Sequence, residues 1–231
     1  MLDTKFWAKY FKVYDLLNLL IPYQELLRDI CDELEIKPRE KILEAGCGTG
    51  NLALKIKERG ARVIGLDNCK EALDLYLKKD PEAEIVLADL TRRLPFPDNY
   101  FDKIACNNVL YAISRKKQIN VLKELYRILR PDGKIVFVNP QRGWSSSKIY
   151  IDGIKKNFKK EGLLPTFYKI TRMIIPTIKI FYYNTLLRKE KNYHFFELDE
   201  QRKLINVMGF SKVGGTRFVY SGQHLLDYAH K

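Results

Sequence analysis

The spacing of hydrophobic residues changes along the chain. It predicts helices at the start of the chain and strands further on. Residues 4–20 place large apolar side chains at spacings of three and four, as on one face of an amphipathic helix. Pro22 is expected to interrupt this pattern, and residues 23–35 then repeat the helical spacing. Residues 1–35 are therefore predicted to form an N-terminal helical cover.

Short apolar runs alternate with amphipathic stretches from residue 41 to residue 139. The runs predict strands at 41–43, 62–67, 83–89, 101–111 (with an exit loop) and 134–139. One of the intervening helices is expected to cover 115–130, and the turn-forming sequence at 129–133 should end it. Strand–helix alternation of this kind predicts an α/β fold, with a mostly parallel sheet and helices on both faces.

The C-terminal segment, residues 192–231, again shows a strand–helix pattern. It predicts a helix at 200–208, followed by strands at 210–220 and 224–229 that pair as a hairpin at the sheet edge. The expected fold is thus a Rossmann-like sheet of seven strands with an antiparallel last strand. Its core consists of residues 36–140 and 192–231.

Residues 141–191 stand apart and predict a helical cap inserted between the fifth and sixth strands. A helix is expected at 148–160, a break at 162–165, and a second helix at 166–188 that Pro176 kinks or splits. The chain has a formal charge of +13, and this segment contributes +9 of it, with 12 basic and 3 acidic residues.

Three interpretations of this basic, apolar cap stay open. It is a lid whose lysines are solvated, or it docks on an anionic membrane surface beside a lipid or isoprenoid acceptor. In the third interpretation it binds RNA phosphates through four lysines. They are Lys155, Lys156, Lys159 and Lys160.

The four cysteines are scattered, without a Cys-x-x-Cys pair or a histidine cluster at ligand spacing. They predict free thiols in a reducing compartment and no metal site, which favours a cytoplasmic protein, with the inner membrane face as a peripheral location. No signal peptide is expected, and no run of eighteen apolar residues predicts a transmembrane helix.

A glycine-rich loop between the first predicted strand and the next helix carries the main functional signal. It reads Glu44, Ala45, Gly46, Cys47, Gly48, Thr49, Gly50, Asn51. Alternate glycines let the backbone adopt positive φ and lie against a ligand, and the following helix start offers free N–H groups. A dinucleotide fingerprint would need a third glycine at Asn51, so a nicotinamide oxidoreductase is disfavoured.

Acidic residues end the next two predicted strands, at the same edge of the sheet. Asp67, with Asn68 beside it, can accept both hydroxyls of a ribose, although the pair also suits a helix N-cap. Asp89 and Leu90 are expected at an adenine, where the carboxylate accepts from the exocyclic amine. The glycine loop, these acids and Asn107 then lie along one carboxyl edge, where such folds bind ligands.

These motifs resemble those of the class I S-adenosylmethionine-dependent methyltransferases, in particular the group that contains the ubiquinone and menaquinone biosynthesis enzymes. The resemblance rests on Glu-Ala-Gly-Cys-Gly-Thr-Gly-Asn, Gly-Leu-Asp, Leu-Ala-Asp-Leu, Leu-Pro-Phe-Pro-Asp-Asn-Tyr-Phe-Asp and Leu-Arg-Pro-Asp-Gly-Lys. It covers residues 36–140 strongly and 193–231 weakly. It implies that Glu44, Gly46 and Gly48 line the methionine end of the cofactor, with Asn107 beside it, and that S-adenosylhomocysteine is the product.

The acceptor is less well defined than the cofactor. Methyl transfer needs a general base only where the acceptor loses a proton, and His194 is the candidate by residue type. Tyr14 and Tyr111 are expected to line the acceptor pocket. The predicted activity is methylation of a small molecule, with a lipid or quinone precursor at a membrane as one candidate; the alternatives are an RNA methyltransferase and a non-catalytic cofactor-binding protein.

Overall fold

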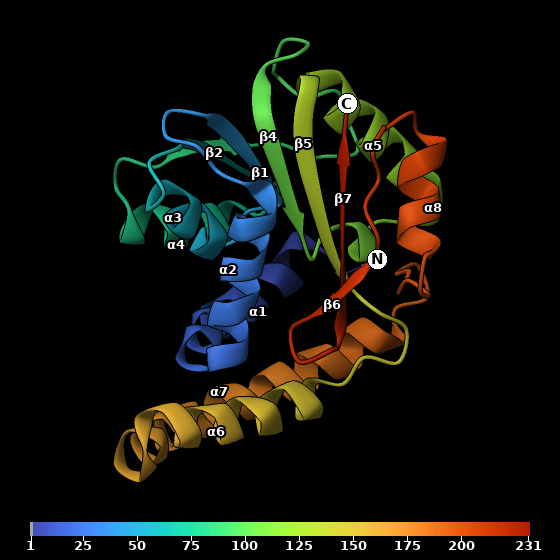
Figure 1. Ribbon diagram of the computed structural model, residues 1–231. Coiled ribbons are helices and arrows are strands. Elements are labelled where there is room, and N and C mark those ends of the chain that lie inside the picture. The colour runs from blue at the N-terminus through green and yellow to red at the C-terminus, as the bar shows by residue number, and fades with distance from the viewer. Residues whose placement is uncertain (1) are drawn as a thin grey trace.

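The computed structural model describes residues 2–231 and contains one seven-stranded sheet with strand order β3-β2-β1-β4-β5-β7-β6 (Figure 1). Strands β1 to β5 run parallel, and β7 runs antiparallel to both of its neighbours. This confirms the predicted fold class, including the antiparallel last strand. The strands are Lys41–Ala45, Arg62–Asp67, Glu84–Leu87, Phe101–Asn107, Leu129–Pro140, Arg217–Val219 and His224–His230, from β1 to β7.

Helices cover both faces of the sheet, and the sheet separates two large apolar clusters. Helices α2 (Ile21–Leu34), α3 (Asn51–Lys57) and α4 (Lys70–Lys79) pack on one face. Helices α5 (Arg115–Ile128) and α8 (Glu200–Val207) pack on the other. The inner strands are buried on both sides, which is why their sequences are continuous apolar runs.

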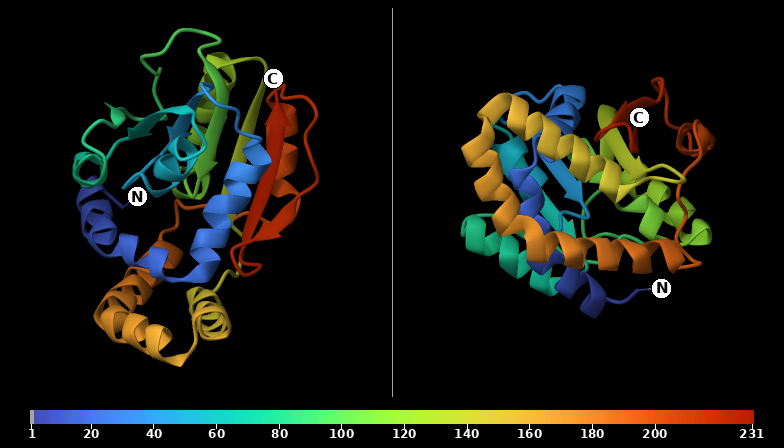
Figure 2. Two further views of the ribbon diagram at one scale, coloured as in Figure 1. Left: turned by 60° about the vertical axis from the view of Figure 1, so that its left-hand side comes forward. Right: turned by 90° about the horizontal axis from the view of Figure 1, so that it is seen from below.

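The cap lies beneath the carboxyl edge of the parallel strands (Figures 1 and 2). It consists of α6 (Ser146–Glu161) and α7 (Leu163–Lys189), and α7 is one helix that continues through Pro176. Its ribbon changes direction midway, as the view from below in Figure 2 shows, so the prediction of a kink holds and a split does not occur. No helix among residues 2–231 is long and apolar enough to cross a membrane.

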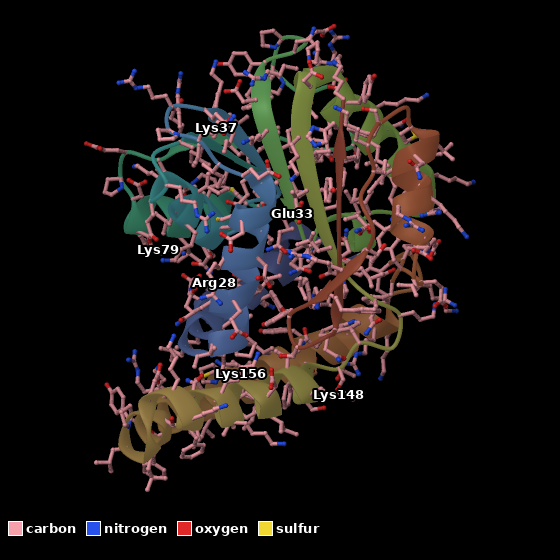
Figure 3. The ribbon with its side chains drawn as sticks, in the orientation of Figure 1. Arg28, Glu33, Lys37, Lys79, Lys148 and Lys156 are labelled. Atoms are coloured by element: carbon pink, nitrogen blue, oxygen red, sulfur yellow. The ribbon has the colours of Figure 1, made fainter. Side chains whose placement is uncertain are left out.

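The N-terminal segment joins the cap to the core. Helix α1 (Thr4–Tyr14) is followed by a 3₁₀ turn, Asp15–Leu19, before α2 begins at Ile21. The buried Asn157 of α6 accepts a hydrogen bond from the Ile21 N–H (3.1 Å) and donates to the Leu19 carbonyl (2.8 Å). Lys156, on the side of α6 that faces α2, pairs with Glu25 at 2.6 Å (Figure 3).

Several predicted boundaries are wrong. The predicted break at 162–165 is Gly162 alone, and Pro22 lies in the first turn of α2, whereas α1 already ends at Tyr14. The predicted turn at 129–133 is the first part of β5, because Leu129 pairs with Phe101 of β4 before a register shift. The predicted strand at 210–220 shrinks to three residues of β6 and an isolated bridge at Ser211. Gly214 lies against the ring of Tyr228, where a Cβ atom would come within 2.1 Å of the ring.

A chain of buried polar side chains links the carboxyl edge to α8 and β7. Asn139 accepts from the Tyr111 N–H (3.1 Å) and donates to Gln201 (2.6 Å), and Gln201 donates to Asp227 (2.7 Å). Thr216 donates to the other carboxylate oxygen of Asp227 at 2.6 Å. Burial raises the pKa of Asp227, and the hydrogen bonds from Thr216 and Gln201 act against that rise. The network therefore depends on every member having its partner.

We expect Gln201→Leu to lower the free energy of unfolding by roughly 2–4 kcal/mol, because it leaves the Asn139 amide donor and one oxygen of the Asp227 carboxylate without a partner in the core. Chemical denaturation would measure the difference. Lys203→Leu, on the exposed side of the same helix, is the control and should change stability little. A Gln201 variant as stable as the control would show that the network does not stabilise the fold.

Candidate functional site

The glycine loop between β1 and α3 is fixed to the end of β2. The N–H groups of Gly46 and Cys47 both donate to the Leu66 carbonyl, at 2.7 and 2.9 Å. Gly48 has a φ of +51°, and a Cβ atom there would lie 2.7 Å from the ring of Phe11. The loop must therefore be glycine-rich both for its backbone angles and for the close approach of α1.

Asp67, the last residue of β2, holds the loop from the other side. One carboxylate oxygen accepts from the Gly48 N–H (2.8 Å) and the other from the Cys69 N–H (2.9 Å), at the start of α4. The side chain therefore orders both the loop and the helix start. Burial raises its pKa, and the backbone N–H groups oppose that rise. Each carboxylate oxygen still has a lone pair available for a ligand hydroxyl.

Asn51 stands where a dinucleotide fingerprint would have glycine, and it ties the loop to the N-terminal segment. Its side-chain amide donates to Asp15 (3.0 Å) and to the Tyr23 hydroxyl (3.3 Å) and accepts from Lys79 at 2.7 Å. Thr49 also donates to Asp15, at 2.5 Å. Asn51 therefore makes three side-chain hydrogen bonds that a glycine at this position could not make.

Two adjacent pockets open at this edge of the sheet. The first, with a volume of about 400 Å³, lies over the ends of β2 and β3 and is called here the sheet-edge pocket. The second, of about 120 Å³, lies between the glycine loop, the N-terminal helices and the cap, and is called the cap pocket. Trp7, Phe11, Gly46 and Asn108 line both, so the two pockets meet beside the loop.

Most of the predicted site residues come together at these pockets. The sheet-edge pocket is lined by Asp67, Asn68, Asp89 and Leu90. The cap pocket is lined by Glu44, Gly46, Cys47, Gly48 and Asn107, together with Tyr14 and Tyr111. The predicted cofactor residues and the predicted acceptor residues therefore lie on neighbouring surfaces.

Three predicted residues lie elsewhere. Ala45 is fully buried within β1, and Gly50 caps α3 with a φ of +75°. His194 lines neither pocket, because its ring bonds to Glu200 of α8 at 2.6 Å. Its backbone N–H donates to the Tyr111 carbonyl at 2.8 Å, so it supports the pocket wall from behind.

The cap pocket holds an unusual number of buried polar atoms that make no hydrogen bond within residues 2–231. They are Glu44 Oε2, Asn107 Oδ1, Asn108 Oδ1, Trp144 Nε1, Thr177 Oγ1 and His224 Nδ1. Buried polar groups are ordinarily satisfied, and leaving one without a partner costs about 1–3 kcal/mol. Polar groups of a bound ligand are the natural partners for this set.

Glu44 contributes the one carboxylate oxygen of this set. Complete burial raises its pKa well above the usual range; a hydrogen bond from the Ala53 N–H lowers it, and the nearby Asp67 raises it further. A buried carboxyl of this kind gains most from a positively charged partner, which would favour its ionised form. The cap pocket can therefore hold a cationic ligand group at Glu44.

Sequence reasoning missed His224, Trp144 and Thr177. They come from the start of β7, the loop after β5 and the inner face of α7. Burial lowers the pKa of His224 to about 3, so its imidazole is neutral at physiological pH. The only sequence signal was a histidine just before the apolar pair Leu225 and Leu226 at the start of a predicted strand.

Comparison with known proteins agrees with this geometry. The Methyltransferase domain family matches residues 43–137. A demethylmenaquinone methyltransferase from Geobacillus sp. is 30% identical over 140 residues, which cover 56% of this chain and 59% of that protein. The tRNA N(3)-methylcytidine methyltransferase Mettl2 of Drosophila melanogaster is 31% identical over 152 residues, 58% of this chain and 46% of that protein. The chain thus spans about half the length of the curated relatives it matches.

A solved structure supports the same fold along the whole chain. An S-adenosylmethionine-dependent methyltransferase from Aquifex aeolicus superposes with a TM-score of 0.62 and 16% identity, covering 99% of this chain and 98% of that one. Residues 43–137 therefore match a methyltransferase domain, and the whole chain has the fold of that S-adenosylmethionine-dependent methyltransferase. The cofactor of this chain is S-adenosylmethionine, and its motifs are similar to those of the demethylmenaquinone methyltransferases, as the sequence predicted.

The pocket residues fit this cofactor. Asp67 has lone pairs that ribose hydroxyls could use, and Asp89 and Leu90 line the same sheet-edge pocket, where an adenine could lie. The unpartnered Glu44 and Asn107 oxygens lie in the cap pocket, where they could accept from the ammonium group of the methionine end. Gly46, which lines both pockets, lies where the two parts of such a ligand would join.

We expect Asp67→Asn to weaken binding of S-adenosylhomocysteine tenfold or more, measured by titration calorimetry. The amide loses the charge and presents an N–H group to one of two backbone N–H donors, so it serves both the ligand and the loop less well. Asp74→Asn, which removes an exposed carboxylate paired with Lys70 on α4, is the matched control. If the Asp67 variant and the control bound S-adenosylhomocysteine with equal affinity, Asp67 would not be part of the cofactor site.

Proposed function

We propose that this chain transfers a methyl group from S-adenosylmethionine to a small, largely apolar acceptor bound in the cap pocket, and that the acceptor is lipid-like and is reached at an anionic membrane surface. The observation that carries the proposal is the lining of the cap pocket. Aromatic and aliphatic side chains from the N-terminal helices and the cap enclose it beside the glycine loop. On the acceptor side, the aromatic and aliphatic side chains that line the pocket include Tyr10, Leu20, Tyr23, Ile149, Met173, Ile180, Leu187 and Tyr220.

The residues of the chain would act mainly by binding, orientation and exclusion of water. Bound S-adenosylmethionine supplies a methyl group on a sulfonium, which an acceptor atom can displace directly. Asp67 and Glu44 would hold the two ends of the cofactor, so that its reactive centre points into the cap pocket. Tyr14 and Tyr111 would form the wall between cofactor and acceptor, in a site from which α1 and the cap exclude solvent.

Tyr10 closes the pocket from the cap side. Its hydroxyl donates to Asn184 of α7 at 3.2 Å, and burial raises its pKa far above the usual value, so it remains a neutral phenol. This contact joins α1 to α7 across the pocket. The acceptor chamber therefore forms only when the N-terminal helix and the cap are both in place.

The outer face of α7 supports the membrane part of the proposal. Ile175 is 67% exposed and Leu164 is 80% exposed, and the same face carries further large apolar side chains at spacings of three and four. These are Phe167, Tyr168, Ile174, Ile178 and Tyr182. Such a contiguous stripe is unusual on a surface that faces water alone, and it is typical of a helix that lies in a membrane interface.

Positive charge surrounds this stripe. The cap carries a net charge of +9, and the side chains of Lys155, Lys159, Lys160, Arg172 and Lys179 are exposed. Each basic residue near an anionic membrane contributes about 1 kcal/mol of attraction at physiological salt. Apolar insertion and electrostatic attraction together favour a membrane over RNA, because RNA binding does not require an exposed aliphatic stripe.

Transfer of label would test the activity. S-adenosylmethionine with a tritiated methyl group is incubated with the protein and either vesicles of total bacterial lipid that contain demethylmenaquinone, or total tRNA. We expect label in the organic extract of the vesicles and none above background with Asp67→Asn. Label only in RNA would support the RNA methyltransferase instead. Tight cofactor binding without label in either fraction would support the non-catalytic protein.

Sedimentation with vesicles would test the surface. We expect the protein to bind phosphatidylglycerol vesicles at low salt, to bind them less at high salt, and not to bind neutral phosphatidylcholine vesicles. The double variant Leu164→Glu, Ile175→Glu should lose binding. Val207→Glu, at an equally exposed apolar residue of α8, should retain it. If wild-type protein stayed in solution under every condition, the cap would be a solvated lid.

A further inference from the structure

Three of the unpartnered atoms in the cap pocket lie far in the sequence from both the glycine loop and the end of β4. They belong to Trp144, Thr177 and His224, called here the His224 cluster. The oxygens of Glu44 and Asn107 were assigned above to the methionine end of the cofactor, and Asn108 lies next to Asn107, so this cluster is the part of the lining without an assigned role. Because it lines the same pocket, the acceptor that the proposed function places there is the ligand that could pair with it.

The position of His224 fits contact with an acceptor. It opens β7 opposite Pro140, the last residue of β5, and thus lies at the carboxyl edge where Asn107 ends β4. Its side chain is 4% exposed and packs between two aromatic rings. The ring centroids of Tyr220 and Trp144 lie 5.0 and 6.1 Å from its own.

The chemistry of the cluster defines the group that it can bind. A neutral imidazole offers one ring nitrogen as an acceptor, and the indole Nε1–H of Trp144 is a donor only. A carbonyl or carboxylate oxygen could accept from the Trp144 indole, but it could pair with Nδ1 of His224 only in the tautomer that carries the proton on that nitrogen. A hydroxyl group both donates and accepts, so it can pair with the indole N–H and with Nδ1 in either tautomer of the imidazole.

We propose that the His224 cluster binds a hydroxyl group of the acceptor, with the His224 imidazole accepting its hydrogen bond and the Trp144 indole donating to its oxygen. The acceptor is then a hydroxylated ring or a lipid-like alcohol, and the apolar remainder fills the aromatic part of the cap pocket. His224 is the specificity-determining residue, because it rejects molecules of the same shape that lack the hydroxyl. The inference rests on the proposed function, since it assumes that the cap pocket holds the acceptor.

A pair of probes that differ only by the hydroxyl tests this assignment. The protein is saturated with S-adenosylhomocysteine, and the affinities of 2-naphthol and naphthalene are compared by fluorescence titration. We expect wild-type protein to bind 2-naphthol about tenfold more tightly than naphthalene, the size of effect that one buried hydrogen bond gives. His224→Phe should bring the ratio close to one while naphthalene affinity is kept.

Control variants separate a local effect from a general one. His230→Phe changes the partly exposed histidine at the other end of β7 and should keep the tenfold ratio. His224→Asn, which retains an acceptor oxygen in a smaller side chain, should still bind 2-naphthol more tightly than naphthalene, by a smaller ratio than wild-type protein. Trp144→Phe removes only the donor and should reduce the ratio without abolishing binding. Thermal unfolding and S-adenosylhomocysteine affinity would show that each variant is folded.

The outcomes distinguish the inference from the proposed function. If both probes bind and the ratio is the same in His224→Phe as in wild-type protein, His224 does not bind the hydroxyl and the inference is overturned, whereas the apolar acceptor pocket stands. If neither probe binds wild-type protein, the acceptor pocket itself is wrong and the inference falls with it. If His224→Phe does not fold, the ratios of His224→Asn and Trp144→Phe decide, and wild-type ratios in both would overturn the inference.

Discussion

The carboxylate of Asp67 is the contact on which the site depends. It accepts from Gly48 in the glycine loop and from Cys69 at the start of α4, so one side chain fixes two backbone segments that meet at the sheet edge. A loop with three glycines has a large conformational entropy to lose, and two hydrogen bonds to a buried charge help to offset it. Because a bound ribose would use the same carboxylate, loop order and cofactor affinity are linked at this residue.

The cap is connected to that loop through the N-terminal segment. Asn157 of α6 holds the turn between α1 and α2, and Asn184 of α7 holds Tyr10. Asp15, in the same turn, accepts from Thr49 and Asn51 of the glycine loop. The cap thus reaches the cofactor loop through side-chain hydrogen bonds, and three separate parts of the sequence must fold together before the pocket exists.

The sequence predicted the features that local chemistry determines. Alternating strands and helices, a glycine loop after a buried strand, and acids at strand ends are sufficient to place Asp67 and Asp89 at one edge. Boundaries that depend on tertiary pairing were missed: Leu129 extends β5 only because Phe101 lies opposite, and Gly214 interrupts a strand where Tyr228 occupies the space.

The His224 cluster was not predictable from the sequence for a similar reason. Its members are 33 to 80 positions apart along the chain and belong to a loop, a helix and a strand, so no spacing relates them. A histidine at the first position of a strand is consistent with either face of a sheet. Only the packing of β7 against β5, with the cap below, brings Trp144, Thr177 and His224 to one pocket.

The two faces of α7 explain why the cap has its composition. Met173, Thr177 and Ile180 face the pocket and are buried, whereas Ile175 and Ile178, on the opposite side of the same helix, are exposed. Covering an exposed isoleucine would contribute roughly 1.5–3 kcal/mol, so a few such residues, with the exposed lysines of the cap, would favour the proposed membrane contact. A membrane that held this outer face would also fix the helix whose inner face forms the pocket wall. Acceptor binding and surface attachment would then be coupled through one helix, which accounts for a segment that is at once basic, apolar and partly buried.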